Sequence, residues 1–256
     1  MPERHGLRPL KSWRYVAAFD DHLMLCAAAV RIGRARQAFW AVWDRRAGRL
    51  HERTNLGPGA VRLGRGRLQV KEGSMALDLT FDEEPGIEVV CQSGASYAWT
   101  RKQGGVRAHG SVSLPGKRRE LDGRAVIDDT AGYYERHTGW SWSAGVGHAA
   151  DGRALAWNLV EGVNDPPHAS ERTVWIDDTE HEVAPVRFAP DLSCVEQLRF
   201  HAEAVREERT NLLLVRSSYR QPFGTFSGRL PGGDSLPQGI DVAEGLGVME
   251  EHDVFW

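Results

Sequence analysis

The stretch "SMALDLTF", residues 74–81, decides the fold class, because apolar and polar side chains alternate along it. Every second residue from Met75 to Phe81 is apolar, and Asp78 and Thr80 lie between them. Successive side chains of a strand point to opposite faces, so this pattern predicts a β-strand with one buried face.

The same alternation recurs along most of the chain. Strand-like runs alternate with turn signals such as "EEPG" (83–86) and "KQGG" (102–105), about every ten residues, which is typical of sandwiches and barrels. Helix signals are scarce, and the best of them, "SCVEQLRFHAEAVREE" (193–208), fits two strands joined at a charged turn better than a helix. The sequence therefore predicts an all-β protein of two antiparallel, calycin-like barrel or half-barrel units. The further runs are "RQAFWAVWD" (36–44), "GIEVVC" (86–91), "SYAWT" (96–100), "ALAWNLV" (154–160), "RTVWIDD" (172–178), "EVAPVRF" (182–188) and "TNLLLVRSSY" (210–219).

The best candidate for a boundary between the two units is "SVSLPGKRRELDGR", residues 111–124. Proline, glycine and charge replace the alternation there. We expect a first lipocalin-like β unit over residues 1–115 and a second over residues 120–256. No sequence repeat relates the two halves.

The composition is that of an ordinary globular protein. Of the 256 residues, 41% are hydrophobic and 26% are charged, and the formal net charge is −3. So small a charge gives no reason to expect nucleic acid as a partner. The apolar run "LMLCAAAV" (23–30) is too short to cross a bilayer, and the N-terminal residues lack the pattern of a signal peptide. We therefore expect a cytoplasmic protein without membrane insertion.

The sequence lacks the short motifs of several common enzyme classes. It holds no G-x-S-x-G, no P-loop, no G-x-G-x-x-G after a strand and no H-E-x-x-H. A standard hydrolase, kinase, Rossmann dehydrogenase or zinc protease is therefore not expected. Cys26, Cys91 and Cys194 are too far apart in sequence to suggest a disulfide framework or a zinc site. We expect neither a metal nor a cofactor.

Aromatic side chains concentrate in "RHTGWSWSAGVG", residues 136–147, and in the run that follows it. Trp140 and Trp142 share one face of the expected strand, and Gly145 follows them closely. Small barrels can leave a cavity where aromatic walls meet glycine or alanine. These two tryptophans and Trp157 are therefore candidates for a cavity wall, and plain core packing explains them equally well.

Four polar side chains near these tryptophans could act on a ligand. His137 and Glu171 are candidates for moving a proton, although a regular strand points His137 away from the two tryptophans. Asn158 lies inside an apolar strand and needs hydrogen-bond partners, from a neighbouring strand or from a ligand. Arg216 could hold an anionic group or could face solvent.

Several uncommon motifs, taken together, resemble an uncharacterised bacterial family that is catalogued as domain of unknown function 2804. The resemblance covers residues 120–256 most strongly. That family is similar to lipocalin-like proteins that include hydroxyneurosporene synthase and fungal Diels–Alderases. The resemblance thus implies paired calycin-type β-barrels with an apolar ligand cavity, but no particular reaction. Two further aromatic candidates for ligand binding, Trp175 and Tyr219, lie in the resembling stretches. The motifs are "DDTAGYY" (128–134), "HTGWSWSAG" (137–145), "WNLVEGVND" (157–165), "SERTVW" (170–175), "YRQPFGTFSG" (219–228) and "GLGVMEEHDVFW" (245–256).

Three kinds of function remain open at this point. The first is a cofactor-independent hydratase, isomerase or cyclase that acts on a terpenoid, polyketide or lipid-like molecule, with His137 or Glu171 as proton donor or acceptor. The second is a carrier or sensor, which needs only an apolar pocket. The third is a structural or interaction module. The enzyme hypothesis requires at least two of His137, Asn158, Glu171 and Arg216 to point into one cavity.

Overall fold

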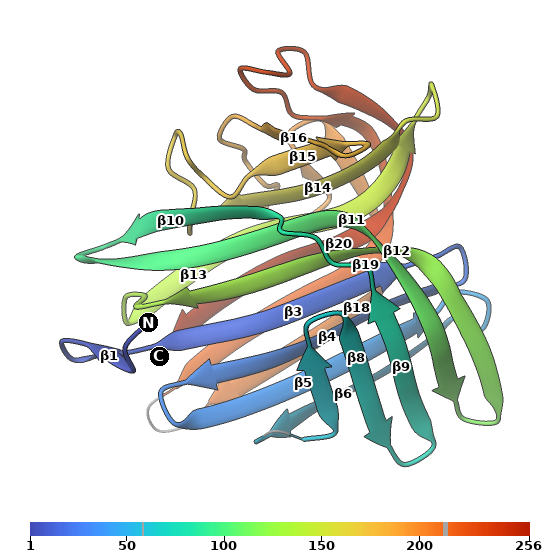
Figure 1. Cartoon of the computed structure of the whole chain (residues 1–256), viewed down its shortest axis with the longest axis horizontal. Helices are drawn as coiled ribbons and strands as arrows, with labels where there is room; N and C mark the ends of the chain where they lie inside the picture. Colours follow the sequence, from blue (N-terminus) through green and yellow to red (C-terminus); the bar gives the residue numbers. More distant parts are fainter. Residues whose placement is uncertain (58, 212–214) are drawn as a thin grey trace.

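The computed structural model describes residues 1–57, 59–211 and 215–256, and all regular elements within them are β-strands. The strands form two large antiparallel sheets and a short hairpin of β1 (Arg4–His5) and β2 (Arg8–Pro9). Figure 1 shows both large sheets, each strongly curled. The predicted all-β fold class is confirmed. Among the described residues, no helix has the length and apolar character needed to cross a membrane.

The first sheet has ten strands. Nine of them lie in the order β6-β5-β4-β3-β12-β11-β9-β8-β7, and β10 pairs with the first part of β11. The bounds are β3 (Lys11–Phe19), β4 (Leu23–Ile32), β5 (Ala35–Asp44), β6 (Arg49–Leu56), β7 (Val61–Gly64), β8 (Arg67–Glu72), β9 (Met75–Phe81), β10 (Ile87–Ser93), β11 (Ser96–Leu114) and β12 (Lys117–Gly132). The opening stretch 74–81 forms β9 almost in full, with the expected alternation of buried and exposed residues.

The second sheet has eight strands in the order β16-β15-β14-β13-β20-β19-β18-β17. The bounds are β13 (His137–Ala149), β14 (Ala154–Glu161), β15 (Thr173–Ile176), β16 (Thr179–Glu182), β17 (Cys194–Val195), β18 (Leu198–Asn211), β19 (Arg216–Leu230) and β20 (Ile240–Phe255). In both sheets the central pairing joins strands that lie far apart in sequence, β3 with β12 and β13 with β20.

The chain passes from the first sheet to the second between β12 and β13, at residues 133–136. The segment 111–124, expected as a boundary, instead forms the hairpin of β11 and β12. Both strands belong to the first sheet, because β12 also pairs with β3 over residues 124–132. The change of sheet thus comes later than expected, and the division into two folding units stays a prediction.

The apolar side chains form three clusters. One lies inside the curl of the first sheet, one inside the curl of the second, and the third lies between the two sheets. Strand β3 shows how this arises: Val16 and Ala18 point into the core of the first sheet, whereas Tyr15, Ala17 and Phe19 point toward the second sheet. Because a strand alternates its faces, β3 is buried on both of them.

The glycines of "KQGG" (102–105) do not make the turn that their composition suggests. They lie within β11, where the pairing register shifts between Gly104 and Val106. A Cβ atom on Gly104 would lie 2.3 Å from the ring of Trp175. The glycine therefore lets a tryptophan of the second sheet pack directly on the backbone of the first.

Two other local expectations have different outcomes. Residues 193–208 form strands β17 and β18 joined by a turn, as predicted. Residues 183–188 of "EVAPVRF" lie outside any strand, and Pro185 there has no N–H to donate to a sheet. Of the run 210–219, residues 212–214 lie outside the described residues.

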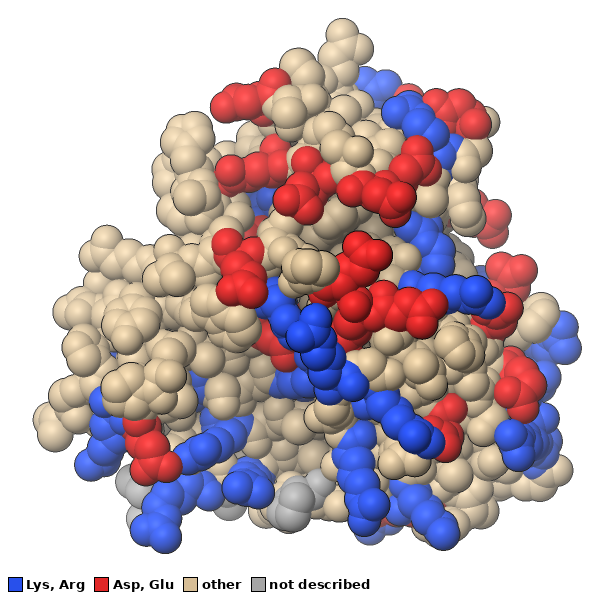
Figure 2. Space-filling model, in the orientation of Figure 1, with Lys and Arg blue, Asp and Glu red and all other residues tan. Residues whose placement is uncertain are grey.

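Figure 2 shows that one face of the molecule carries charges of both signs, unevenly spread. Asp and Glu gather in the upper half of the view, and Lys and Arg gather along its lower edge. This face is therefore polar and divided in charge rather than covered by one sign.

Candidate functional site

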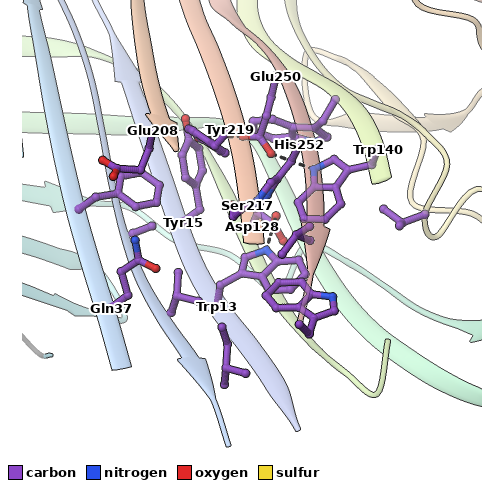
Figure 3. A pocket seen from close by; sticks show the side chains of 18 of the residues that line it. Trp13, Tyr15, Gln37, Asp128, Trp140, Glu208, Ser217, Tyr219, Glu250 and His252 are labelled. Carbon is purple, nitrogen blue, oxygen red and sulfur yellow. Dashed lines mark hydrogen bonds between the residues drawn. The ribbon is translucent and has the colours of Figure 1, made fainter. Parts of the chain in front are cut away.

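A cavity of about 150 Å³ lies between the two sheets, beside the apolar cluster that they share. Figure 3 shows side chains of both sheets around it, among them Trp13 from β3 and Trp140 from β13. A cavity of this volume with apolar walls has room for about one benzene-sized ring. The structure thus holds a cavity with aromatic side chains in its walls, but between the two sheets rather than inside a barrel.

Two aromatic pairs line the cavity, and each pair spans the two sheets. The rings of Trp13 and Trp140 are parallel within 6°, with centroids 6.2 Å apart. Tyr15 and Trp142 meet edge to face at 5.4 Å. On β3 the two aromatic residues, Trp13 and Tyr15, are two positions apart, and the same holds for Trp140 and Trp142 on β13. Residues at this spacing share one face of a strand, which here is the face toward the other sheet.

Each sheet places a carboxyl group beside its tryptophan. The indole N–H of Trp13 donates to Asp128 Oδ2 at 3.0 Å, and that of Trp140 donates to Glu250 Oε1 at 2.8 Å. In both sheets the carboxyl residue lies two positions before the residue that pairs with the tryptophan. The two sheets therefore present the same tryptophan–carboxyl arrangement to the cavity.

Glu250 is a buried carboxyl group held by neutral donors. Trp140 donates to its Oε1 atom, while Tyr219 and Gln221 donate to Oε2 at 2.9 and 2.8 Å. No cationic side chain of the described residues lies within 4 Å of it as an ion-pair partner. Burial raises the pKa of Glu250; the Trp140 and Tyr219 donors oppose this rise, and the charge of Asp128 adds to it. The group is thus biased toward its neutral, proton-carrying form.

The second carboxyl centre of the cavity is a buried ion cluster. Lys102 Nζ lies 2.6 Å from Asp128 Oδ1 and 3.2 Å from Glu171 Oε1. Asn164 donates to Glu171 Oε2 at 3.0 Å. Lys102 and Asp128 belong to the first sheet and Glu171 to the loop between β14 and β15, so the cluster ties the two sheets together.

The charges in this cluster support one another. Burial alone would lower the pKa of Lys102, but Asp128 and Glu171 outweigh it and raise that pKa above its ordinary value. Burial raises the pKa of Glu171, Lys102 opposes the rise, and Asp128 adds to it. Lys102 therefore keeps its positive charge, which compensates the negative charges of the carboxylates around it.

Asn158 lies behind the cavity wall and joins two residues that form it. Its side-chain oxygen accepts from the indole N–H of Trp142 at 2.8 Å, and its amide nitrogen donates to the carbonyl of Glu171 at 2.8 Å. Both of its polar atoms are thus used inside the protein. Asn158 orients a wall tryptophan and the loop that carries Glu171.

Arg206 adds a guanidinium group to the cavity wall. It donates to Thr54 Oγ1 at 2.7 Å and lies 3.6 Å from Glu52 Oε2. Its guanidinium carbon lies 4.0 Å from the ring centroid of Phe39 and 4.9 Å from that of Tyr219. The aromatic faces and the two polar partners together hold this cation in place.

His252 adds a neutral imidazole to the wall. Burial lowers its pKa to about 3, with Asp253 opposing the decrease and Arg206 adding to it. The ring lies 2.7 Å from Ser217 Oγ through Nε2 and meets the Trp140 ring at 4.4 Å. At neutral pH it is therefore a hydrogen-bonding group without charge.

Four of the residues predicted from the sequence line the cavity, namely Trp140, Trp142, Glu171 and Tyr219. Trp140 and Trp142 were singled out by their alternation, Glu171 as a carboxyl near the aromatic run, and Tyr219 by its place in a motif that carries the family resemblance. The part that each plays toward a ligand stays a prediction.

The other predicted tryptophans lie elsewhere. Trp157 is fully buried in the core of the second sheet, where it meets Phe226 at 4.9 Å. It points to the face of β14 opposite the cavity. Trp175 packs on Gly104 in the contact between the sheets, outside the cavity lining.

His137 and Arg216 lie outside the cavity on either side of Phe255. The imidazole of His137 stacks on this ring at 4.2 Å, and it binds Asp253 Oδ2 at 2.7 Å. The guanidinium of Arg216 lies 4.8 Å from the same ring. Both side chains are exposed, and Asn158 lies behind the wall, so Glu171 is the one of the four polar candidates that lines the cavity. The condition set from the sequence for an enzyme, at least two of these four in one cavity, is therefore not met, and an enzymatic role has to rest on other residues.

Glu250, Asp128 and Tyr15 line the cavity and were missed in the sequence. One signal for them was present: Trp13-Arg14-Tyr15 repeats the aromatic spacing of residues 140–142. The second signal was a carboxyl residue at a position of a strand that faces inward, namely Glu250 in "VMEEHDVF" (248–255). Neither signal shows which strands pair, and the pairing is what brings these groups together.

No three side chains of His, Cys, Asp or Glu within the described ranges 1–57, 59–211 and 215–256 come together in a way that could hold a metal ion. The carboxyl groups of the cavity are instead occupied by indole, hydroxyl, amide and ammonium donors.

Residues 60–256 match the family described as domain of unknown function (DUF2804). No curated protein matches this sequence. Similar solved structures share the fold at low identity. Kievitone hydratase from Nectria haematococca has a TM-score of 0.57 at 11% identity and covers 96% of this chain and 88% of its own. A protein described as an AttH from Nitrosomonas europaea has a TM-score of 0.51 at 14% identity, with 97% and 94% covered. CghA has a TM-score of 0.50 at 12% identity, with 100% and 93% covered.

Proposed function

The chain belongs to the DUF2804 family, and from this premise we propose that it binds an apolar small molecule between its two sheets and transfers a proton to it without a cofactor. The chemistry is that of a hydratase, isomerase or cyclase, in which an acid protonates an unsaturated substrate. The observation that carries the proposal is Glu250, a buried carboxyl on the cavity wall with neutral hydrogen-bond partners.

A carboxylic acid is useful as a proton donor only if it keeps its proton near neutral pH. Burial and the nearby charge of Asp128 raise the pKa of Glu250, which favours the protonated form. A positioned proton donor contributes typically about 10²–10⁴-fold to a rate. Glu171 is the second candidate, but Lys102 at 3.2 Å stabilises its ionised form. Glu250 is therefore the better proton donor.

The rest of the cavity supports an apolar ligand. Aromatic and aliphatic side chains together make up the apolar part of the walls, and Trp13, Tyr15, Trp140 and Trp142 offer flat surfaces from both sheets. Apolar walls with a few convergent polar groups are typical of small-molecule sites. The fold is shared with a hydratase, which makes water addition the first reaction to test.

The experiment uses a panel of small unsaturated fragments of terpenoid, polyketide and fatty-acid-like molecules, each of about the size of one benzene ring. Binding is followed by tryptophan fluorescence, and conversion is followed by mass spectrometry in ordinary water and in deuterium oxide. We expect at least one molecule to bind and to gain one water, or to rearrange with uptake of deuterium. The Glu250→Gln variant should bind that molecule and lose conversion.

His137→Ala is the matched control, because His137 is titratable and close in sequence to the site but exposed outside the cavity. It should leave both binding and conversion unchanged. If no member of the panel changes the emission, the binding proposal is wrong. If a molecule binds but Glu250→Gln alters only its affinity, the protein is a carrier and not an enzyme.

A further inference from the structure

Ser217 and His252 form a hydrogen-bonded pair on the cavity wall that the proposed proton transfer does not use. Ser217 Oγ lies 2.7 Å from His252 Nε2, and both residues line the cavity. Both residues are partly exposed, so water has access to the pair. A hydroxyl group donates one hydrogen bond and accepts others, so its contact with His252 leaves Ser217 able to bind a water molecule.

Strand β20 places this pair beside the proposed acid. Glu250 and His252 are two residues apart, so they share the face of β20 toward the cavity and lie about 7 Å apart along the strand. The His252 ring meets the Trp140 ring at 4.4 Å and the Tyr219 ring at 5.2 Å. These are the two side chains that donate to the Glu250 carboxyl, and Figure 3 shows His252 between them. The same two side chains therefore position both the acid and the imidazole.

The addition of water to a double bond needs two groups of this kind side by side. An acid gives a proton to one carbon, and a second group holds the water whose oxygen bonds to the neighbouring carbon. An isomerase or a cyclase needs the acid but no place for water. A hydroxyl–imidazole pair next to the acid therefore favours hydration among these reactions.

We infer that Ser217 binds the water that adds to the substrate, that His252 orients the Ser217 hydroxyl and takes up the released proton, and that the reaction of this site is hydration. The inference rests on the proposed function and selects one of its three reactions. Ser217 touches the reacting water, whereas His252 acts through Ser217 as a positioning residue.

The atoms and electrons of this reaction balance. The π electrons of the double bond take the proton of Glu250, which forms a C–H bond and leaves a carbocation and a carboxylate. The water oxygen then bonds to the cationic carbon. The protonated alcohol that results is a strong acid, so it gives its proton to the Ser217 oxygen while the Ser217 proton moves to His252 Nε2. One alkene and one water thus become one alcohol.

The proton then returns to the acid. Burial keeps the pKa of His252 at about 3, whereas the pKa of Glu250 is raised by burial above its ordinary value. A proton on the imidazole therefore passes to the Glu250 carboxylate, which restores the starting state of both groups.

The first test measures the binding of two saturated probes of nearly the same shape, 1-methylcyclopentanol and 1,1-dimethylcyclopentane. The alcohol is the product of water addition to 1-methylcyclopentene, and the hydrocarbon has a methyl group in place of its hydroxyl. Affinities for the full chain are measured by ligand-observed nuclear magnetic resonance. Ser217→Ala should weaken the alcohol roughly three- to tenfold and leave the hydrocarbon unchanged. Ser218→Ala is the matched control, because Ser218 is exposed on the other face of β19, and it should affect neither probe.

The second test follows 1-methylcyclopentene in deuterium oxide by mass spectrometry. The wild type should form deuterated 1-methylcyclopentanol. In Ser217→Ala the acid is intact, so the recovered alkene should still take up deuterium while alcohol formation falls at least about tenfold. His252→Gln keeps a hydrogen-bonding side chain beside Ser217 but cannot take up the proton. It should therefore bind the alcohol like the wild type and lose its formation, which a merely structural role of His252 would not produce.

The outcomes distinguish this inference from the function on which it rests. If neither saturated probe binds the wild type, the cavity is not a small-molecule site and both fail. If the alkene takes up no deuterium with the wild type, the proton transfer fails and the inference fails with it. If both saturated probes bind and Ser217→Ala weakens them equally, the water site fails alone. If the alkene takes up deuterium but no alcohol forms, the proton transfer stands and hydration is wrong.

Discussion

Trp13 and Trp140 lie parallel across the boundary between the two sheets, with ring planes within 6° and centroids 6.2 Å apart. Each indole also holds one carboxyl, Asp128 or Glu250, through its N–H. One pair of stacked rings therefore positions two acids of different character. Asp128 is paired with a lysine, whereas Glu250 has neutral partners. A shift of one sheet relative to the other would disturb both acids at once.

The buried lysine should be essential for stability. Lys102→Met leaves Asp128 and Glu171 without their cation, and breaking a buried ion pair in this way costs about 3–5 kcal/mol. Urea denaturation should show this loss in the free energy of unfolding. Lys71→Met, on the exposed face of β8, should change it by less than about 0.5 kcal/mol. An equal effect of the two substitutions would contradict the buried cluster.

The pH dependence of stability should reveal the state of Glu250. Its pKa in the folded protein is raised above the ordinary value of 4.5, so folding favours the protonated form. Below pH 4.5, Glu250 is protonated in both the folded and the unfolded state, so its titration does not change the free energy of unfolding. As the pH rises, the unfolded chain ionises first and the folded protein loses stability until the folded-state pKa is passed.

Glu250→Gln removes this titration. The difference in unfolding free energy between variant and wild type should therefore move in favour of the variant as the pH rises above about 4.5. Denaturant titrations at several pH values measure it. Val248→Ala, two residues away and without a charge, should give a difference that does not depend on pH. A flat difference for Glu250→Gln would mean that the carboxyl is not perturbed by burial.

The tryptophans should respond differently to a bound ligand. Trp142 lines the cavity, whereas Trp157 lies in the core of the second sheet. We expect Trp157→Phe to keep the change in emission on ligand binding and Trp142→Phe to lose a large part of it. Fluorescence titration with one bound member of the panel decides this. A response carried by Trp157 would place the ligand inside the second sheet and not between the sheets.

The contact between the sheets should depend on a glycine. In Gly104→Ala the new methyl group would lie 2.3 Å from the Trp175 ring, and such overpacking typically costs about 1–3 kcal/mol. Thermal unfolding should show the loss. Gly139→Ala is the matched control, since its nearest neighbour would be Asp253 Oδ2 at 3.4 Å. If the two variants unfold alike, Trp175 does not pack on the backbone at Gly104.

The fold class was predictable because alternation is a local property of the sequence. The run 74–81 became β9, and the ambiguous run 193–208 became two strands. The boundary at 111–124 failed for a physical reason: a hairpin tip and a domain linker have the same composition of proline, glycine and charge. Only the pairing of β12 with β3, more than a hundred residues apart, tells them apart.

The site was predictable only in part for the same reason. Trp140 and Trp142 are two residues apart, and their common face follows from the strand. Asp128 meets Trp13 across 115 residues and Glu250 meets Trp140 across 110. His137 was attractive as a titratable group beside the aromatic run, but its odd position on β13 turned it to solvent.

The long-range pairing of β3 with β12 and of β13 with β20 also has a consequence for the rate of folding. Each sheet is joined at its centre by the strands that lie at its two ends in the sequence, so the intervening chain must be confined before these hydrogen bonds form. Folds dominated by such distant contacts cross a high entropic barrier and fold in the order of milliseconds to seconds. We therefore expect slow refolding in which the local hairpins, such as β4 with β5, gain protection from hydrogen exchange before the central strands do.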